Sequence, residues 1–199
     1  MELTTGTQQN TVHYKNISSP PGGLLLWILI LLEVFTFGLA LAGLVYYRTE
    51  DPVLFAQSTA ALNTVLGGTN TIILLTSGFF MAASVHYFKK QNTKTGVNFM
   101  LATIITGCAF IVVKWYEYSE KIEMGLGLEE NLFFTFYWLL TGFHLIHVVV
   151  GLVILVLILL RINNKGHIII EDTKAGAAFW HMCDLIWLLL FPALYLVFQ

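Results

Sequence analysis

The sequence has very little charge: only 11% of its 199 residues are Asp, Glu, Lys or Arg, whereas 57% are hydrophobic. A soluble domain carries about 25% charged residues, so this chain has too few to cover a surface that faces water. An ordinary globular enzyme and a disordered protein are therefore excluded. The formal net charge of -2 also leaves no basic surface for nucleic acid, so no nucleic-acid partner is expected. An integral membrane protein is the remaining class.

Cysteine pairs and a secretory signal are lacking as well. Cys108 and Cys183 lie inside apolar runs and form no Cys-x-x-Cys motif, which predicts two buried thiols rather than a disulfide framework. No apolar run occurs before residue 24, whereas a signal peptide needs one. We expect residues 1–23 to form a polar cytoplasmic tail that ends in Pro-Pro-Gly-Gly just before the membrane.

Long apolar runs are abundant. Each is about as long as the ~20 residues that cross ~30 Å of hydrocarbon, and backbone polar groups in lipid must bond internally, which requires helices here. The sequence therefore predicts an all-α integral membrane bundle of five transmembrane helices within a single domain, residues 24–199. The expected spans are 24–47, 67–88, 97–116, 133–160 and 177–198.

The connections between these spans predict an orientation. With five crossings, the N-terminal tail and the second and fourth connections share one side of the membrane. That side carries seven cations, against three on the other: Lys15, Lys89, Lys90, Lys94, Arg161, Lys165 and Lys174, against Arg48, Lys114 and Lys121. Because cytoplasmic loops are enriched in Lys and Arg, the N-terminus is expected to be cytoplasmic and the C-terminus outside, in a cell inner membrane.

Information about function comes from ionisable residues within the apolar spans. A charged residue at the centre of a membrane helix costs about 2.5–3.5 kcal/mol, and such residues usually face the protein interior and find partners. We expect the bundle to gather these side chains into one intramembrane polar cluster and Asp184 to have a hydrogen-bond partner, with His181 a candidate. The members are Glu33, Glu117, His144, His147, His181 and Asp184. Glu33 could relay protons or act as a protonated structural donor.

A metal or haem site is an alternative for the histidines, because neutral imidazole is a common metal ligand. The i, i+3 spacing of His144 and His147 has no convincing facing pair, however, and does not make a bis-histidine haem site. A di-iron site would use Glu-x-x-His on paired helices, and the buried residues contain no such motif. The residues alone therefore favour histidines that hydrogen-bond neighbouring helices over histidines that bind a metal or haem.

Two motifs resemble a known family. The run Thr141-Gly-Phe-His144-Leu-Ile-His147-Val-Val-Val-Gly151 is similar to the Thr-Gly-Phe-His-x-x-His-Val-x-x-Gly signature of subunit III of the haem–copper oxidases. Trp180-His181-Met-Cys-Asp184-Leu-Ile-Trp187 resembles the Trp-His-x-x-Asp-x-x-Trp of the last helix in that family. The longer members have seven helices, and this chain resembles their last five.

The resemblance implies an accessory role within a larger respiratory complex such as cytochrome c oxidase. Subunit III of this family binds no haem or copper, which belong to partner subunits I and II; it packs against subunit I, holds lipids and supports proton uptake. The resemblance also adds Trp187 to the polar and packing set. None of these residues is implied to be catalytic.

Other functions stay open at this point. The five-helix form and the sequence 188–196 also resemble the accessory subunit associated with nitric oxide reductases. A self-contained membrane haem or metal enzyme is a more remote alternative. A transporter is disfavoured, because the sequence shows no internal repeat and no pair of Gly/Pro-interrupted spans.

Overall fold

The computed structural model describes residues 22–165 and 170–197, with the side chains of residues 164 and 165 left out. Nearly all of the predicted polar tail, residues 1–21, lies outside the described residues. Within the described part the chain is helical and contains no strand, which confirms the all-α prediction. The helices are α1 (Gly23–Glu50), α2 (Pro52–Ala60), α3 (Thr64–Lys89), α4 (Thr93–Glu123), α5 (Leu132–Lys165) and α6 (Ile170–Tyr195).

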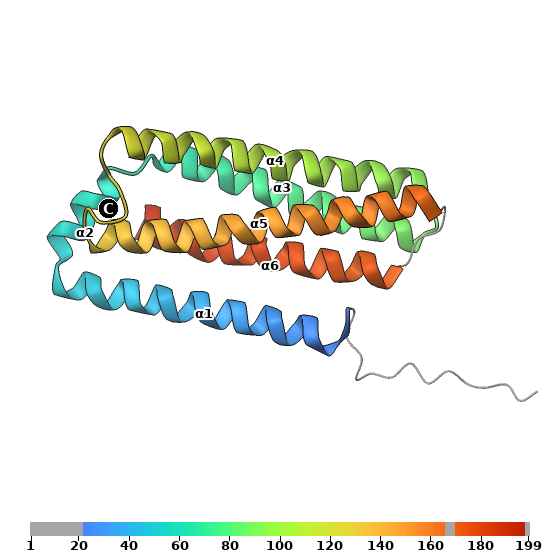
Figure 1. Ribbon diagram of the computed structural model, residues 1–199, viewed down its shortest axis with the longest axis horizontal. Coiled ribbons are helices and arrows are strands. Elements are labelled where there is room, and N and C mark those ends of the chain that lie inside the picture. The colour runs from blue at the N-terminus through green and yellow to red at the C-terminus, as the bar shows by residue number, and fades with distance from the viewer. Residues whose placement is uncertain (1–21, 166–169, 198–199) are drawn as a thin grey trace, which may run out of the picture.

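Five of these helices, all except α2, are long and apolar enough to cross a membrane. They lie along a common direction, with α3 and α4 side by side and α1 on the opposite side of α5 and α6 (Figure 1). Helix α6 is the most enclosed, with 56% of its apolar window buried, whereas only 6% of that of α1 is buried. The bundle is therefore centred on α6, and α1 is peripheral.

The α3–α4 pair is fixed by polar contacts as well as by packing. The Ser77 hydroxyl donates to the Thr103 carbonyl at 3.0 Å, and the Ser84 hydroxyl donates to the Gly96 carbonyl at 2.8 Å. Both hydroxyls are fully buried. Hydrogen bonds of this kind hold helices together in a lipid environment, where no hydrophobic force acts between them.

The predicted loop between the first two spans contains a short helix that the sequence analysis missed. Helix α2 begins at Pro52, whose fixed φ suits the first turn of a helix, and the Asp51 side chain accepts a hydrogen bond from the Leu54 amide at 3.1 Å. Phe55, Ser58 and Thr59 of α2 are buried. A hydropathy search for spans of about 20 residues does not detect a helix of nine.

The transmembrane helices also extend further than predicted. Helix α6 begins at Ile170 instead of residue 177, and α4 continues to Glu123 instead of residue 116. These extensions are polar, because they include Glu171, Asp172 and Lys174 in α6. A helix can continue into water as long as its backbone hydrogen bonds are made. Hydropathy detects only the apolar segment of the helix, the segment that lies in the hydrocarbon of the membrane.

The two cysteines differ in environment. Cys183 is buried in the α6 core, as predicted, but Cys108 on α4 is exposed on the surface of this chain. The prediction of two buried thiols is therefore wrong for Cys108. Its neighbour Gly107 is the residue of α4 that contacts Trp180 and Leu152, so Cys108 points away from that contact.

Candidate functional site

A fully buried ion pair lies on α4. The Lys114 ammonium donates to Glu117 Oε2 at 2.9 Å, and the two side chains are 1% and 0% exposed. Lys114 also donates to the Tyr195 hydroxyl at 2.9 Å and approaches that of Tyr137 at 3.4 Å. Both tyrosine hydroxyls donate to Glu117 Oε1. This Lys114–Glu117 cluster, with Tyr137 and Tyr195, therefore connects α4, α5 and α6.

Aromatic faces complete the surroundings of the cluster. The Lys114 ammonium lies 5.0 Å from the ring centroid of Tyr137 and 5.1 Å from those of Tyr118 and Trp187. Cation–π attraction of this kind is strongest for a desolvated cation. The Trp187 indole N–H donates to the Thr71 hydroxyl at 3.0 Å. Trp187 thus links the cluster to α3.

His144 lies beside this cluster in an aromatic enclosure. Its ring stacks on Trp187 at 5.3 Å between centroids and meets the edge of Phe110 at 5.9 Å. The residue is fully buried, and neither ring nitrogen has a hydrogen-bond partner among the described residues. His144 therefore packs as an aromatic ring in this chain.

Glu33 and His147 form a second group, between α1 and α5. Glu33 Oε2 lies 3.5 Å from His147 Nε2, and the side chains are 19% and 12% exposed. His147 Nδ1 is 2.8 Å from the Phe143 carbonyl, so Nδ1 must carry a hydrogen to donate. Nε2 would then present a lone pair to a carboxylate oxygen unless a further proton lies on one of the two groups. Glu33 Oε2 itself has no hydrogen-bond partner among the described residues, so the two groups face each other in a close contact and not in a hydrogen bond.

His181 and Asp184 form a third group, where α6 meets α3. Their side chains approach at 3.1 Å between Nδ1 and Oδ2, which confirms the prediction that Asp184 has a partner. Gly78 of α3 faces this carboxylate, and a Cβ at Gly78 would lie only 2.3 Å from Asp184 Oδ2. The absence of a side chain at Gly78 is therefore what lets α3 approach the carboxylate.

The predicted site residues thus occupy three neighbourhoods. Glu117, Trp187 and His144 lie together; Glu33 pairs with His147 across two helices, and His181 pairs with Asp184. The structure shows no direct polar contact that joins one of these groups to another among the described residues.

The sequence analysis missed three members of the buried cluster: Lys114, Tyr137 and Tyr195. From the sequence, Lys114 was counted only among the three cations expected on the outer side of the membrane. A signal was present, because Lys114 lies three residues before Glu117 and side chains at i, i+3 share a helix face. Nothing comparable marks the two tyrosines, which come from other helices.

The described residues offer no obvious metal centre. No group of three or more His, Cys, Asp or Glu side chains within residues 22–165 and 170–197 is arranged to hold a metal ion. The carboxylates of Glu117, Glu33 and Asp184 instead lie against Lys114, His147 and His181, respectively. Chemically, the arrangement can hold protons and tie helices together.

Comparison with known proteins identifies the family. The sequence profile described as cytochrome c oxidase subunit III matches residues 57–198. This chain belongs to the cytochrome c oxidase subunit III family. The match spans α3 to α6 and so includes the Lys114–Glu117 cluster and both histidine motifs, in agreement with the resemblance seen in the sequence.

Several curated subunit III relatives are similar along most of the chain. Cytochrome c oxidase subunit 3 of Synechocystis sp. is 30% identical over 178 residues, 88% of this chain and 74% of that protein. A probable quinol oxidase subunit 3 of Staphylococcus saprophyticus is 23% identical over 193 residues, 94% of each chain. Heme-copper oxidase subunit I+III of Aeropyrum pernix is 27% identical over 86% of this chain, which spans only 22% of that longer protein.

Proposed function

We propose that this chain serves as subunit III of a respiratory haem–copper oxidase in a cell inner membrane. In this proposal it packs against catalytic subunit I, and the complex also contains subunit II. The observation that carries the proposal is the family match over residues 57–198. The similarity to a protein named as subunit I+III supports a direct association with subunit I.

The chain itself is proposed to be non-catalytic and to stabilise the complex, with haem and copper held by the partner subunits. The polar groups of the bundle support this role. The Lys114–Glu117 cluster joins three helices, and His144 is stacked between aromatic rings. These contacts tie α4, α5 and α6 into a firm scaffold.

The Glu33–His147 pair is proposed to aid proton uptake by the complex. Glu33 lies on the peripheral helix α1 and faces His147 of α5 at 3.5 Å, and both side chains are mostly buried. A group that accepts and releases a proton within a membrane is typical of proton pathways. The pair would then act as a local proton reservoir for the neighbouring subunit.

Replacing Glu33 with glutamine tests the proton role, because the amide keeps the shape but loses the titratable group. We expect the oxygen-reduction rate of the complex to fall severalfold at alkaline pH, where protons are scarce, and to change little at acidic pH. Glu120→Gln, a carboxylate of α4, serves as the control. Equal pH profiles for Glu33→Gln and the unmodified complex would contradict the proton role.

We also propose an orientation of the chain in the membrane, based on the charges at the two ends of the bundle. The described cations at the α3–α4 turn and the α5–α6 end are Lys89, Lys90, Lys94, Arg161 and Lys174. The opposite end carries several acidic residues, among them Glu50, Asp51, Glu123, Glu129 and Glu130. The positive-inside rule then places the α3–α4 turn in the cytoplasm and the end of α6 outside.

Gentle purification of the tagged chain from its native membrane tests the assignment. We expect the chain to co-purify with a haem-containing subunit I and a subunit II, both identified by mass spectrometry. Co-purification with the catalytic subunit of a nitric oxide reductase would instead replace the oxidase assignment. A chain that purifies without any respiratory subunit would contradict the proposal.

A further inference from the structure

Two tyrosines of the Lys114–Glu117 cluster share one proton acceptor. Tyr137 of α5 and Tyr195 of α6 are fully buried, and both hydroxyls donate to Glu117 Oε1. As the partner of the Lys114 ammonium, Glu117 is a carboxylate with lone pairs that can take up a proton. The Tyr137 hydroxyl lies 3.0 Å from Glu117 Oε1, which is within reach for proton transfer. Each hydroxyl can therefore pass its proton to Glu117 along a hydrogen bond that is already formed.

A half-buried tryptophan connects this pair to one end of the bundle. The ring centroids of Tyr195 and Tyr137 are 6.4 Å apart, and those of Tyr137 and Trp138 are 5.7 Å apart. The Trp138 N–H donates to the Leu126 carbonyl at 2.9 Å. That carbonyl lies in the connection between α4 and α5, at the same end of the bundle as α2 (Figure 1). Tyrosine and tryptophan rings are easily oxidised, so the three rings form a short electron path from the buried cluster to the α2 end.

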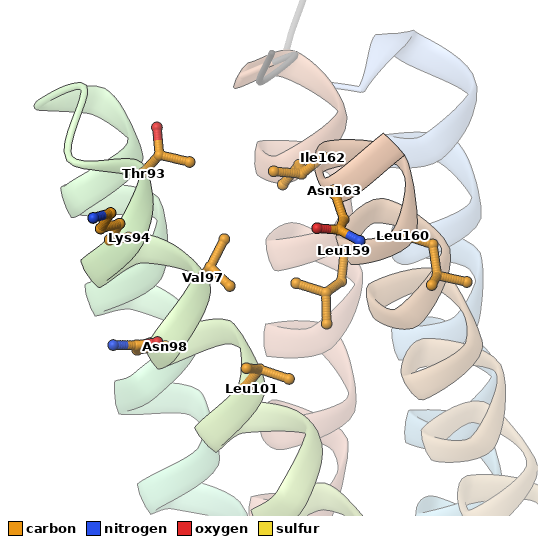
Figure 2. Close-up of a pocket in the computed structure, with 9 residues that line it drawn as sticks. All are labelled: Thr93, Lys94, Val97, Asn98, Leu101, Leu159, Leu160, Ile162 and Asn163. Atoms are coloured by element: carbon orange, nitrogen blue, oxygen red, sulfur yellow. The ribbon is translucent and has the colours of Figure 1, made fainter. Parts of the chain in front are cut away.

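The opposite end of the same two helices has no such rings. A groove lies there between the start of α4 and the end of α5, and Figure 2 shows Val97 and Leu101 of α4 facing Leu159 of α5 across it. No Tyr or Trp is among the residues that line this groove. The side chains that α4 and α5 turn toward each other at this end are aliphatic. Packing of α4 near α5 therefore does not by itself require the phenol and indole groups found beside Glu117.

The shared carboxylate matters for electron transfer. Removing an electron from a buried phenol would place a new charge in an apolar interior, which is costly. If the proton moves to Glu117 at the same time, the tyrosine becomes a neutral radical and the carboxylate becomes a neutral acid. The Lys114 ammonium is then the remaining charge, and it lies 5.0 Å from the ring centroid of Tyr137 and 5.1 Å from that of Trp187. These aromatic faces stabilise a cation.

We propose that Tyr137 and Tyr195 are a redox-active pair that gives one electron to strong oxidants at the α2 end of the bundle. Oxygen-centred radicals, which arise when oxygen is incompletely reduced, are the class of oxidant that such a pair takes. Trp138 is the electron relay and Glu117 is the proton acceptor. The pair belongs to this chain alone and does not depend on the oxidase assignment.

The electrons and protons of this step balance. The oxidant takes one electron from the Trp138 indole and is itself reduced by one electron. Tyr137 then gives an electron to the Trp138 radical cation, while its O–H bond breaks and the proton moves to Glu117 Oε1. The products are a neutral Trp138, a neutral tyrosyl radical and a protonated Glu117. An external one-electron donor restores the tyrosine, and Glu117 returns the proton.

Light-driven oxidation of the full chain tests the pair. A ruthenium polypyridyl complex is attached to the thiol of Leu128→Cys in a chain that also carries Cys108→Ser, since Cys183 is buried. Residue 128 is exposed and lies two residues after the carbonyl that Trp138 contacts. A flash with an irreversible electron acceptor makes the complex a one-electron oxidant. We expect the EPR spectrum of a neutral tyrosyl radical, which narrows when the chain contains ring-deuterated tyrosine.

Substitutions assign the radical. Tyr137→Phe combined with Tyr195→Phe should lower the tyrosyl yield severalfold. Tyr118→Phe is the matched control: its ring centroid lies only 4.6 Å from that of Trp138, but its hydroxyl donates to the Thr141 hydroxyl and has no carboxylate acceptor. Tyr118→Phe should therefore keep most of the yield. An equal loss in Tyr118→Phe and in the double variant, or no loss in the double variant, would overturn the proposal.

Two further variants test the proton acceptor and the relay. Glu117→Gln cannot take up the proton, so the tyrosyl signal should be lost and a tryptophan radical should replace it. Because Glu117→Gln leaves the Lys114 ammonium without its partner, Trp138→Phe is the second variant, since it leaves the ion pair intact. Trp138→Phe should lower the tyrosyl yield severalfold, and an unchanged yield would show that Trp138 is not the relay and would contradict the path.

Discussion

Replacing Lys114 with methionine is expected to lower the free energy of unfolding by about 3–5 kcal/mol, the usual cost of removing one partner of a buried ion pair. Glu117 would remain fully buried without its cation. The two tyrosine hydroxyls would still donate to Glu117 Oε1 but could not neutralise it. SDS titration in mixed micelles, followed by circular dichroism, measures the change.

Two variants make this prediction specific. Lys114→Met combined with Glu117→Gln removes both charges and keeps the amide oxygen as an acceptor for the tyrosines, so most of the stability should return. Lys121→Met on the same helix should cost less, about 1 kcal/mol, because its partner Glu120 is 29% exposed. If Lys114→Met is no more harmful than Lys121→Met, the buried Lys114–Glu117 pair does not stabilise the bundle.

Gly78→Ala is expected to cost about 2–3 kcal/mol, the range for overpacking a tight contact. The added Cβ would lie 2.3 Å from Asp184 Oδ2, so the carboxylate must shift, which strains its contact with His181. Nothing lies within 4 Å of a Cβ at Gly142. Gly142→Ala is therefore the matched control and should be neutral or slightly stabilising, since alanine favours helix over glycine by about 1 kcal/mol.

A second substitution tests the cause of that loss. Asp184→Ala removes the oxygen that the new methyl group would meet, so the two changes should be less harmful together than the sum of their separate effects. A double-mutant cycle of unfolding free energies measures this coupling. Strict additivity would show that the contact between Gly78 and Asp184 does not explain the effect of Gly78→Ala.

The five membrane helices could be predicted from hydropathy alone. Backbone polar groups without hydrogen bonds are costly in lipid, so an apolar run of this length must form a helix. The ends of the helices could not be predicted in this way, since polar turns such as residues 170–176 of α6 extend the helix beyond the apolar run. Helix α2 was missed because nine residues are too few to produce a membrane signal. Its start is nevertheless marked in the sequence by the Asp51-Pro52 pair, which is typical of a capped first turn.

Most residues of the candidate site could be predicted from the sequence, but how they are grouped in space could not. The spacing of His181 and Asp184 correctly indicates a pair, because both lie on one helix face. The pairing of Glu33 with His147, and the Tyr137 and Tyr195 contacts with Lys114, depend on how separate helices rotate and slide against one another. How the helices rotate and slide is set by the packing of whole helix faces, which the spacing of a few polar residues does not reveal. The sequence therefore suggested one polar cluster where the structure has three neighbourhoods.

We propose that this polypeptide supports a catalytic partner and carries no redox cofactor of its own. Optical absorption of the chain after its separation from the purified complex tests this most directly. We predict a spectrum without a Soret band, with all haem and copper remaining in the partner fraction. A stoichiometric Soret band in the isolated chain, lost when His144 or His147 is replaced, would contradict the account.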